Sequence, residues 1–184
     1  MPDRIHQVLT ELLVLRAQAR QSDAIGLLIR QWHERLLRHA RRLTGAEDGA
    51  HDVLQEAWLD ICRGLSGLDD PARFGPWAYR IVTRRSARWV RQRQRVRQVE
   101  SAWTDQQSRV APPDDAARVD AADAVRTAFR RLPAEQQTLL ELRYVEDFGI
   151  EQIATALGIA AGTMKSRLFQ ARQELREHIL QVTQ

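Results

Sequence analysis

Hydrophobic residues recur at helical spacing along almost the whole chain. Between Asp23 and Gly45, apolar residues return every three or four positions, which predicts an amphipathic helix with its N-cap at Asp23 and its stop at Gly45. A similar apolar stripe predicts another helix over about 48–65. No segment shows a convincing alternation of polar and apolar residues, the pattern of a half-buried strand. The predicted fold class is therefore all-α.

Residues 3–20 form a short predicted helix of their own. Its apolar positions fall on one stripe, formed by Ile5, Val8, Leu9, Leu12 and Leu15. A helix of this length is only marginally stable in water by itself, so the stripe needs a surface to pack against. Two interpretations remain open: the helix packs on the domain that follows, or it is a regulatory arm that binds a partner.

The C-terminal part of the chain predicts shorter helices. Two of them cover residues 120–131 and 133–145, with a break at Leu132-Pro133. Residues 149–179 then have the pattern of a helix-turn-helix, in which a short helix, a tight turn and a longer helix follow one another. Gly158 suits the tight turn, because glycine adopts a left-handed backbone without steric cost.

The second helix of this motif is predicted to begin near Gly162 and to bury a stripe that starts at Met164. Lysine and serine side chains can contact phosphates or base edges, and an outward phenylalanine can touch a thymine methyl group. The motif therefore either reads DNA or serves only as an architectural corner. The side chains off the buried stripe are Lys165, Ser166, Phe169, Gln170 and Gln173.

Helical periodicity fades over residues 98–119, where Pro112-Pro113 interrupts a stretch rich in Ser, Gln, Thr and Asp. This composition predicts a flexible interdomain linker, which could span roughly 70 Å at about 3.3 Å per residue if extended. The chain is thus expected to comprise two small helical domains, preceded by an arm. The predicted divisions are the arm 1–22, the first domain 23–97, the linker 98–119 and the helix-turn-helix domain 120–184.

The composition is that of a globular protein, with 43% hydrophobic and 28% charged residues among 184. The single cysteine, Cys62, excludes an internal disulfide and is expected to be a small buried hydrophobe. The five histidines lack metal-ligand spacing, so no metal and no cofactor are predicted. No apolar run approaches membrane-spanning length and no signal peptide opens the chain, which favours a cytoplasmic protein without membrane insertion.

Positive charge is concentrated in the first half of the chain. Residues 1–98 contain 18 arginines and 11 acidic residues, whereas the net charge of the whole chain is only +4. The stretch 71–97 holds nine arginines and no acidic residue, and helical spacing places five of them on one stripe. A solvated helix face normally mixes both signs, so the missing carboxylates favour nucleic-acid binding over that simpler interpretation. The five are Arg80, Arg84, Arg88, Arg91 and Arg95.

Aromatic residues are interleaved with these arginines. Trp77, Tyr79 and Trp89 could stack on unpaired bases, as aromatic side chains do in proteins that bind single strands. Each could equally belong to the core. The loop 66–74 precedes this helix and could present side chains, including Phe74, to the same ligand.

The predicted helix over 48–65 carries an acidic and amide cluster around an outward leucine. Such a cluster indicates a protein partner, although a solvated face is also possible. Its members are Asp52, Gln55, Glu56 and Leu59.

These motifs together resemble bacterial RNA polymerase sigma factors of the extracytoplasmic-function (ECF) group, of which only the second and fourth conserved regions are present. The segment AHDVLQEAWLDICR is similar to the family's Glu-Asp-Leu-Val-Gln-Glu helix, which binds the clamp coiled coil of the polymerase. The resemblance therefore implies that Asp52, Gln55 and Glu56, with neighbouring Leu59, contact core polymerase.

The segment FGPWAYRIVTRR resembles the family's helix that engages the −10 promoter element, with matches at Trp77, Tyr79, Arg80 and Ile81. The resemblance implies a −10 contact by Trp77, Tyr79 and Arg80. Arg84 and Arg88 depart from the family pattern, and the arginine stripe and the preceding loop extend the expected −10 contact to Phe74, Arg84, Arg88 and Arg91. The segment GTMKSRLFQARQEL resembles the family's −35 recognition helix. The matching residues Thr163, Lys165, Ser166, Arg167 and Arg172 are the −35 contacts that the resemblance implies. Phe169, Gln170 and Gln173, which lie off the buried stripe, complete the expected −35 face, with Gln170 at a position where the family commonly has Arg.

Membership of this family implies a non-enzymatic initiation factor that binds core RNA polymerase and promoter DNA and is commonly held inactive by an anti-sigma factor. Two rival functions are weighed against it. A stand-alone helix-turn-helix regulator would usually need a ligand, receiver or dimerisation domain, and the first 118 residues show no α/β pattern for a receiver. A nuclease would need a carboxylate or histidine cluster to hold a metal, and the basic half shows none near its arginines.

Overall fold

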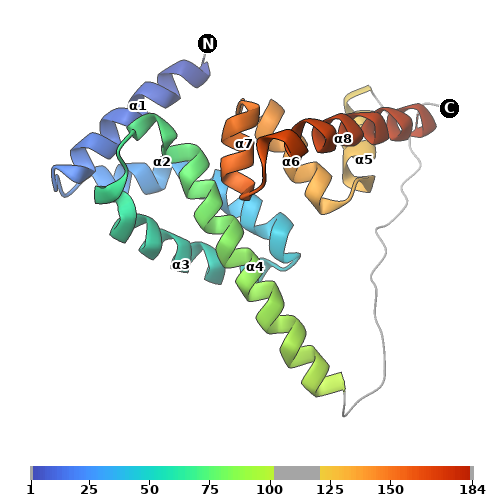
Figure 1. Ribbon diagram of the computed structural model, residues 1–184, viewed down its shortest axis with the longest axis horizontal. Coiled ribbons are helices and arrows are strands. Elements are labelled where there is room, and N and C mark those ends of the chain that lie inside the picture. The colour runs from blue at the N-terminus through green and yellow to red at the C-terminus, as the bar shows by residue number, and fades with distance from the viewer. Residues whose placement is uncertain (1, 102–120, 183–184) are drawn as a thin grey trace.

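The computed structural model describes residues 2–101 and 121–182 (Figure 1). All regular secondary structure in these two ranges is helical, which confirms the predicted all-α class. Two short 3-10 turns, η1 (Leu65–Gly67) and η2 (Pro71–Arg73), join the third and fourth helices. The helices are α1 (Pro2–Gln18), α2 (Ala24–Thr44), α3 (Glu47–Gly64), α4 (Phe74–Ser101), α5 (Ala121–Arg131), α6 (Ala134–Tyr144), α7 (Ile150–Leu157) and α8 (Ala161–Val182).

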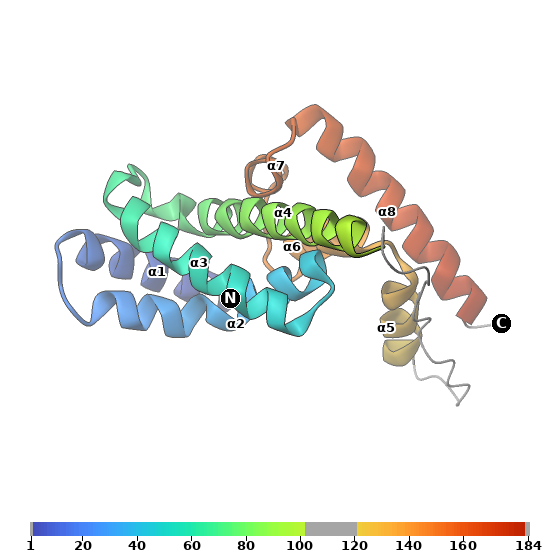
Figure 2. The ribbon, with the colours of Figure 1, turned by 90° about the horizontal axis from the view of Figure 1, so that it is seen from below.

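The N-terminal unit is built on α2, α3 and α4, which pack against one another around a shared apolar core (Figure 2). Leu28 and Leu36 of α2 meet Leu54 and Ile61 of α3 in this core, and all four are fully buried. Helix α2 ends as predicted at Gly45, whose φ of 64° lies in the left-handed region. Each helix thus buries one stripe, as its amphipathic sequence requires.

Helix α1 packs on α2, as the first of its two interpretations proposed. The predicted packing face is wrong, however: Leu13, Val14 and Ala17 are buried against the core, whereas the stripe that begins at Ile5 is exposed. At the end of α1, Gln18 donates hydrogen bonds from Nε2 to the carbonyl oxygens of Leu65 (2.9 Å) and Leu68 (2.8 Å). The N-terminal helix therefore also holds the segment that leads into α4.

Two local predictions need correction. Asp23 precedes α2, but its side chain makes no capping hydrogen bond and instead pairs with Arg16, at 3.1 Å between Oδ2 and Nη2. Cys62 is exposed rather than buried, because it lies one residue beyond the buried Ile61 and points off the core stripe of α3.

Helix α4 is longer than its sequence pattern predicts. It begins at Phe74, two residues before Pro76, and continues through Ser101, four residues beyond the predicted domain end at 97. Proline is tolerated there because the first turn of a helix has no intrahelical partner for its N–H groups. The rest of the predicted linker, including Pro112-Pro113, lies outside the described residues.

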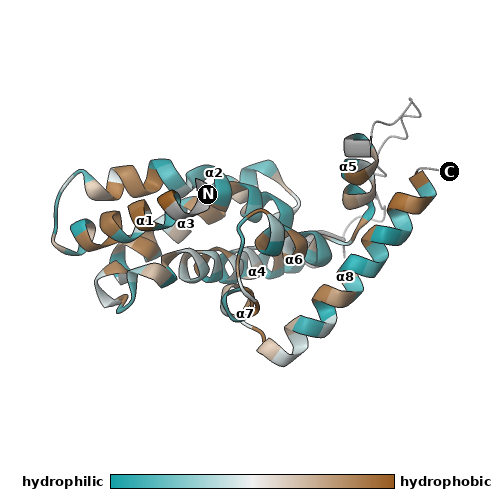
Figure 3. Ribbon diagram, turned by 90° about the horizontal axis from the view of Figure 1, so that it is seen from above, coloured by the Kyte–Doolittle hydropathy of each residue, from teal (hydrophilic) through white to brown (hydrophobic). Residues whose placement is uncertain are grey.

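The C-terminal unit places α5 and α6 against α8, and α7 crosses α8 as the first helix of the helix-turn-helix. Gly158 ends α7 with φ 70°, which confirms the predicted tight turn. Met164, Leu168 and Ala171 form the buried stripe of α8. The opposite face of α8 is largely polar along its length (Figure 3).

His39 is a buried titratable residue of the N-terminal unit that sequence patterns did not single out. Its Nε2 lies 2.9 Å from Oγ1 of Thr83, and that hydroxyl donates its only proton to the carbonyl of Tyr79. Nε2 therefore carries the imidazole proton and donates, while buried Nδ1 has no hydrogen-bond partner. Burial first, and then the charge of Arg42, lowers the pKa of His39 from 6.5 to about 3.

We expect Met164→Ala to lower the free energy of unfolding of the C-terminal unit by about 2–5 kcal/mol, because it removes a fully buried side chain from the α8 stripe. Phe169→Ala, on the exposed face of the same helix, is the matched control and should change it by less than about 0.5 kcal/mol. Urea unfolding of both variants measures the difference. Equal effects would contradict the assignment of the two faces.

We also expect stability to fall as pH decreases below 6.5, because the unfolded chain then binds a proton at His39 that the folded chain excludes down to pH about 3. Between pH 7.5 and pH 5, the wild type should lose about 2 kcal/mol more than His39→Gln, whose amide can still donate to Thr83. His33→Gln is the control, and urea unfolding at each pH is the measurement. Identical pH dependence of the wild type and His39→Gln would show that His39 is not held neutral.

Candidate nucleic-acid interface

The arginine stripe of α4 is exposed and is not neutralised by carboxylates. Arg85 lies beside it and behaves differently: its Nε is 2.6 Å from Oδ2 of Asp60, and its Nη1 is 2.7 Å from Oε2 of Glu56. These carboxylates raise the pKa of Arg85. Within the described residues, none of the following arginines forms an ion pair, and we call them the arginine stripe: Arg80, Arg84, Arg88, Arg91 and Arg95.

A groove runs along this stripe between α3 and the end of α7. Arg84 and Arg88 of α4 line it with half-buried Trp77, and its other side is closed by Leu157 of α7 and by Gly158, which follows that helix. Guanidinium groups beside an accessible aromatic ring suit a nucleic-acid strand, because the cations meet phosphates and the ring meets a base.

Two residues predicted to contact DNA instead belong to the core. Phe74 is 0% exposed and Tyr79 is 1% exposed, and both pack edge-on against Trp32, with ring centroids 5.4 and 6.4 Å away. The prediction of direct DNA contacts by these two side chains is therefore wrong for this arrangement of the two units, in which Tyr79 also packs against Phe148 of the C-terminal unit. The helical spacing of Phe74, Ala78 and Val82, which are all buried, is the sequence signal that could have placed Phe74 in the core.

The acidic cluster of α3 is exposed as predicted. Asp52, Gln55 and Glu56 are all at the surface, and the side chain of Leu59 is 52% exposed beside them. They border a groove between α3 and α4 that Trp89 also lines. An exposed leucine among carboxylates, next to a partly buried indole, has the character of a protein-binding site.

The polar face of α8 is also exposed as predicted. Phe169 is 61% exposed, and the guanidinium of Arg172 lies 5.7 Å from the ring centroid of Tyr144. Arg167 differs from the others, because it is only half exposed and pairs with Glu135 of α6. The exposed predicted residues are Thr163, Lys165, Ser166, Phe169, Gln170, Arg172 and Gln173.

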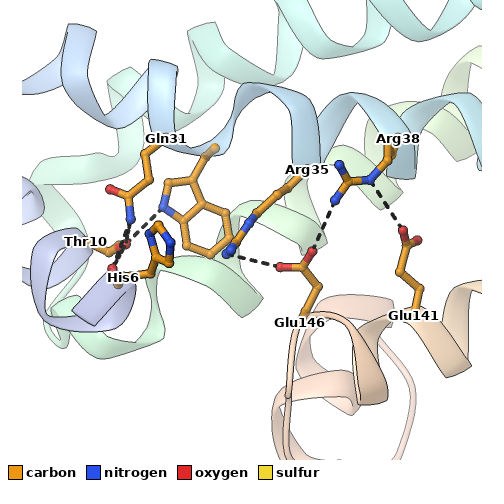
Figure 4. A network of polar contacts seen from close by, with 8 residues as sticks. His6, Thr10, Gln31, Arg35, Arg38, Glu141 and Glu146 are labelled. Atoms are coloured by element: carbon orange, nitrogen blue, oxygen red, sulfur yellow. Dashed lines mark hydrogen bonds and ion pairs between the residues drawn. The ribbon is translucent and has the colours of Figure 1, made fainter. Parts of the chain in front are cut away.

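A contact between the two units was not foreseen from the sequence. Helix α7 packs on α4 and α6 packs on α2, so the C-terminal unit lies directly on the N-terminal one (Figure 1). Glu146, in the turn after α6, reaches Arg35 and Arg38 of α2 (Figure 4). On the same α2 face, Trp32 donates its indole N–H to Thr10 of α1, at 3.1 Å. The described residues thus form one closed arrangement.

Other kinds of site find no support in the part of the chain that the structure describes. Residues 2–101 and 121–182 contain no group of three or more His, Cys, Asp or Glu side chains placed to hold a metal ion. None of the helices in these ranges is both long enough and apolar enough to cross a membrane. The two basic or polar helix faces and the acidic cluster are therefore the features that suggest binding.

Comparison with known proteins agrees with this division into two units. The family model described as Sigma-70 region 2 matches residues 28–96, and the model described as Sigma-70, region 4 matches residues 122–175. The solved structure of CnrH in complex with the cytosolic domain of CnrY has the same fold, with a TM-score of 0.61 at 19% identity over 92% of this chain and 96% of that one. RpoE of Bartonella quintana, solved with the anti-sigma factor NepR, also gives a TM-score of 0.61, at 24% identity over 88% of this chain and 99% of that one.

Other known proteins have a higher sequence identity to this chain than these two solved structures do. The ECF RNA polymerase sigma factor SigM of Mycobacterium tuberculosis is 33% identical over 153 residues, which cover 83% of this chain and 75% of SigM. The RNA polymerase sigma-E factor of Streptomyces coelicolor is 31% identical over 83% of this chain and 84% of its own length. SigE of Mycolicibacterium smegmatis is 31% identical over 166 residues, and the match spans only 60% of SigE. The chain belongs to the ECF family of RNA polymerase sigma factors.

Proposed function

We propose that this protein is an alternative sigma factor that binds core RNA polymerase and directs it to promoters with specific −10 and −35 elements. The observation that carries the proposal is the unpaired arginine stripe on α4, together with an exposed recognition face on α8 in the other unit. A stand-alone helix-turn-helix regulator would leave the first unit, including the α3 cluster, without a role.

We assign the polymerase contact to the acidic cluster of α3. Asp52, Gln55 and Leu59 project from one exposed face and are free of the ion pairs that tie Glu56 to Arg85 among the described residues. Charged and amide side chains around an exposed leucine fit a helical partner surface, because the leucine supplies apolar burial and the polar groups fix the orientation.

We assign the −10 contact to the arginine stripe and Trp77, and the −35 contact to the exposed face of α8. The stripe would track phosphates of the unwound strand, while Trp77 would stack on a base. A helix in the major groove reads base edges with its N-terminal residues, which in α8 include Thr163, Lys165 and Ser166.

The two promoter elements are too far apart for the closed arrangement to contact both. Centres about 25 base pairs apart on a straight duplex are about 85 Å apart, at 3.4 Å per base pair. In contrast, α7 packs directly on α4. We therefore infer that the units 23–97 and 120–184 separate when the factor engages a promoter, with the intervening residues as the linker.

Regulation and location follow from the same proposal. An anti-sigma factor is the partner that we expect to hold the protein inactive, because the similar folds of CnrH and RpoE were solved with CnrY and with the anti-sigma factor NepR. The cytoplasm is the expected location, since polymerase and promoter DNA are there. Promoter recognition requires binding and strand separation rather than catalysis, so we assign no catalytic residue and no cofactor.

The double substitution Asp52→Ala/Gln55→Ala should weaken binding to purified core RNA polymerase by at least about tenfold, the effect of removing roughly 1.4 kcal/mol from an interface. Glu34→Ala/Arg30→Ala, on an exposed part of α2, is the matched control and should bind like the wild type. Fluorescence anisotropy with labelled factor measures both affinities. Equal weakening in both double variants, or in neither, would remove the polymerase contact from α3.

Neutralising two members of the arginine stripe, in Arg84→Gln/Arg91→Gln, should reduce the salt dependence of promoter binding by the holoenzyme. The slope of log K against log salt should fall by about 0.9 for each phosphate that is no longer neutralised, or by about 0.7 where the strand is single. Arg20→Gln/Arg30→Gln provides the control, because both arginines are exposed and neither belongs to α4. An unaltered slope in Arg84→Gln/Arg91→Gln would mean that the stripe is merely solvated.

A further inference from the structure

Helix α2 carries a second row of arginines that the functional assignments above do not use. Arg35, Arg38 and Arg42 follow one another at spacings of three and four, so they lie on one face of the helix. We call them the α2 arginine row. Over seven residues the row rises about 10 Å, which matches the rise of about three phosphates along one strand of a duplex.

Every carboxylate that pairs with the row in the described structure comes from the other unit. Glu146 approaches Arg35, at 3.5 Å between Oε2 and Nη1, and Arg38, at 3.9 Å between Oε1 and Nη2. Glu141 of α6 pairs with Arg42 and lies 3.7 Å from Nε of Arg38. Figure 4 shows both carboxylates pointing from the C-terminal unit toward α2.

The Glu146 carboxylate is held in the contact rather than resting on the surface. Its side chain is only 1% exposed, and Oε2 has no hydrogen-bond partner, so the nearby guanidinium charges and a hydrogen bond with the Tyr79 side chain compensate the carboxylate. Its negative charge adds to burial in raising the pKa of Tyr79 well above the usual range. An anion thus occupies a site that arginines form on the N-terminal unit.

An apolar side chain, that of Phe148, packs next to the Glu146 carboxylate. The ring of Phe148 packs edge-on against Tyr79, with centroids 5.5 Å apart. It also lies over Gly75, where an added Cβ would come within 3.1 Å of the Phe148 ring and 2.8 Å of Trp32. The absence of a side chain at Gly75 therefore leaves space for the turn after α6, and the surface of the N-terminal unit fits Phe148 at this point.

If the two units separated, Arg35, Arg38 and Arg42 would all lose their carboxylate partners together. The N-terminal unit would then present two unpaired rows of guanidinium groups, on α2 and on α4, which are neighbouring helices. Guanidinium groups bind phosphates with paired, charge-assisted hydrogen bonds of the kind they form with carboxylates. A phosphate backbone can therefore replace both glutamates.

We propose that the α2 arginine row is a nucleic-acid phosphate-binding site that Glu141 and Glu146 occupy in the closed arrangement, so that nucleic acid and the C-terminal unit compete for it. The proposal rests on the proposed function in so far as the ligand is nucleic acid. It goes further by placing a contact on α2, outside all −10 and −35 residues, and by making release of the C-terminal unit a condition for that contact.

The test uses the full chain without polymerase and a labelled duplex that lacks promoter sequence. Glu141→Gln/Glu146→Gln, which keeps side-chain shape, should increase the radius of gyration in X-ray scattering and bind the duplex at least about tenfold more tightly. Its salt slope should exceed that of the wild type by up to about 2.7, at about 0.9 for each of three neutralised phosphates. Phe148→Ser removes the apolar contact between the two units without changing the charge, and it should likewise increase the radius of gyration and tighten duplex binding.

Adding Arg35→Gln/Arg38→Gln/Arg42→Gln to the glutamine variant should abolish the gain in affinity. Adding Arg20→Gln/Arg30→Gln/Arg176→Gln, three exposed arginines elsewhere, should leave most of it. Circular dichroism checks that each variant is folded. The proposal would be overturned if the gain in affinity survived removal of the α2 arginine row, or if the chain expanded without binding DNA more tightly. It would also be overturned if neither Glu141→Gln/Glu146→Gln nor Phe148→Ser increased the radius of gyration.

Polymerase-dependent transcription from a cognate promoter, measured on the same variants, distinguishes this inference from the proposed function. Promoter-directed transcription by the wild type, combined with no effect of the row on DNA binding, would overturn only the α2 site. Failure of the wild type to direct transcription at any promoter would overturn the proposed function instead.

Discussion

The partly buried arginines of this protein are compensated by carboxylates, and the packing of its helices depends on which element supplies those carboxylates. Within the N-terminal unit, α3 supplies Asp60 and Glu56 to Arg85 and so fixes α3 against α4. The carboxylates that pair with the α2 arginine row belong to the C-terminal unit, and these ion pairs hold the two units together. The stripe on α4 has no carboxylate partner among the described residues, and the proposed function gives it a nucleic-acid strand as its partner.

Much of the fold could be predicted because the local sequence of each helix contains the pattern that specifies it. The apolar period sets which face of α2 and α8 is buried, and glycines at 45 and 158 end their helices in the left-handed conformation that the chain requires there. The exposed faces of α3 and α8 followed directly from the same periodicity. Candidate binding residues on those faces, such as Gln55 and Phe169, are exposed in the structure for that reason.

The errors and omissions arise where local pattern is ambiguous or silent. An aromatic residue among arginines can stack on a base or enter the core, and Phe74 and Tyr79 do the latter. The closed arrangement depends on Glu146 and Phe148, which lie in a turn between helices and belong to no periodic stripe. Their partners lie far away in the chain: Arg35 precedes Glu146 by more than 100 residues, and Tyr79 precedes Phe148 by about 70. Only the three-dimensional structure pairs such distant residues.

Gln18 gives the N-terminal helix a reach beyond its own packing. By holding two carbonyl groups of the segment before α4, it lets a helix outside both matched family regions shape the segment that leads into the arginine-rich helix. Related factors that share the same arginines but differ in their first twenty residues would present that approach differently. If the proposed function holds, changes in the N-terminal helix could alter promoter choice and leave every arginine of α4 in place.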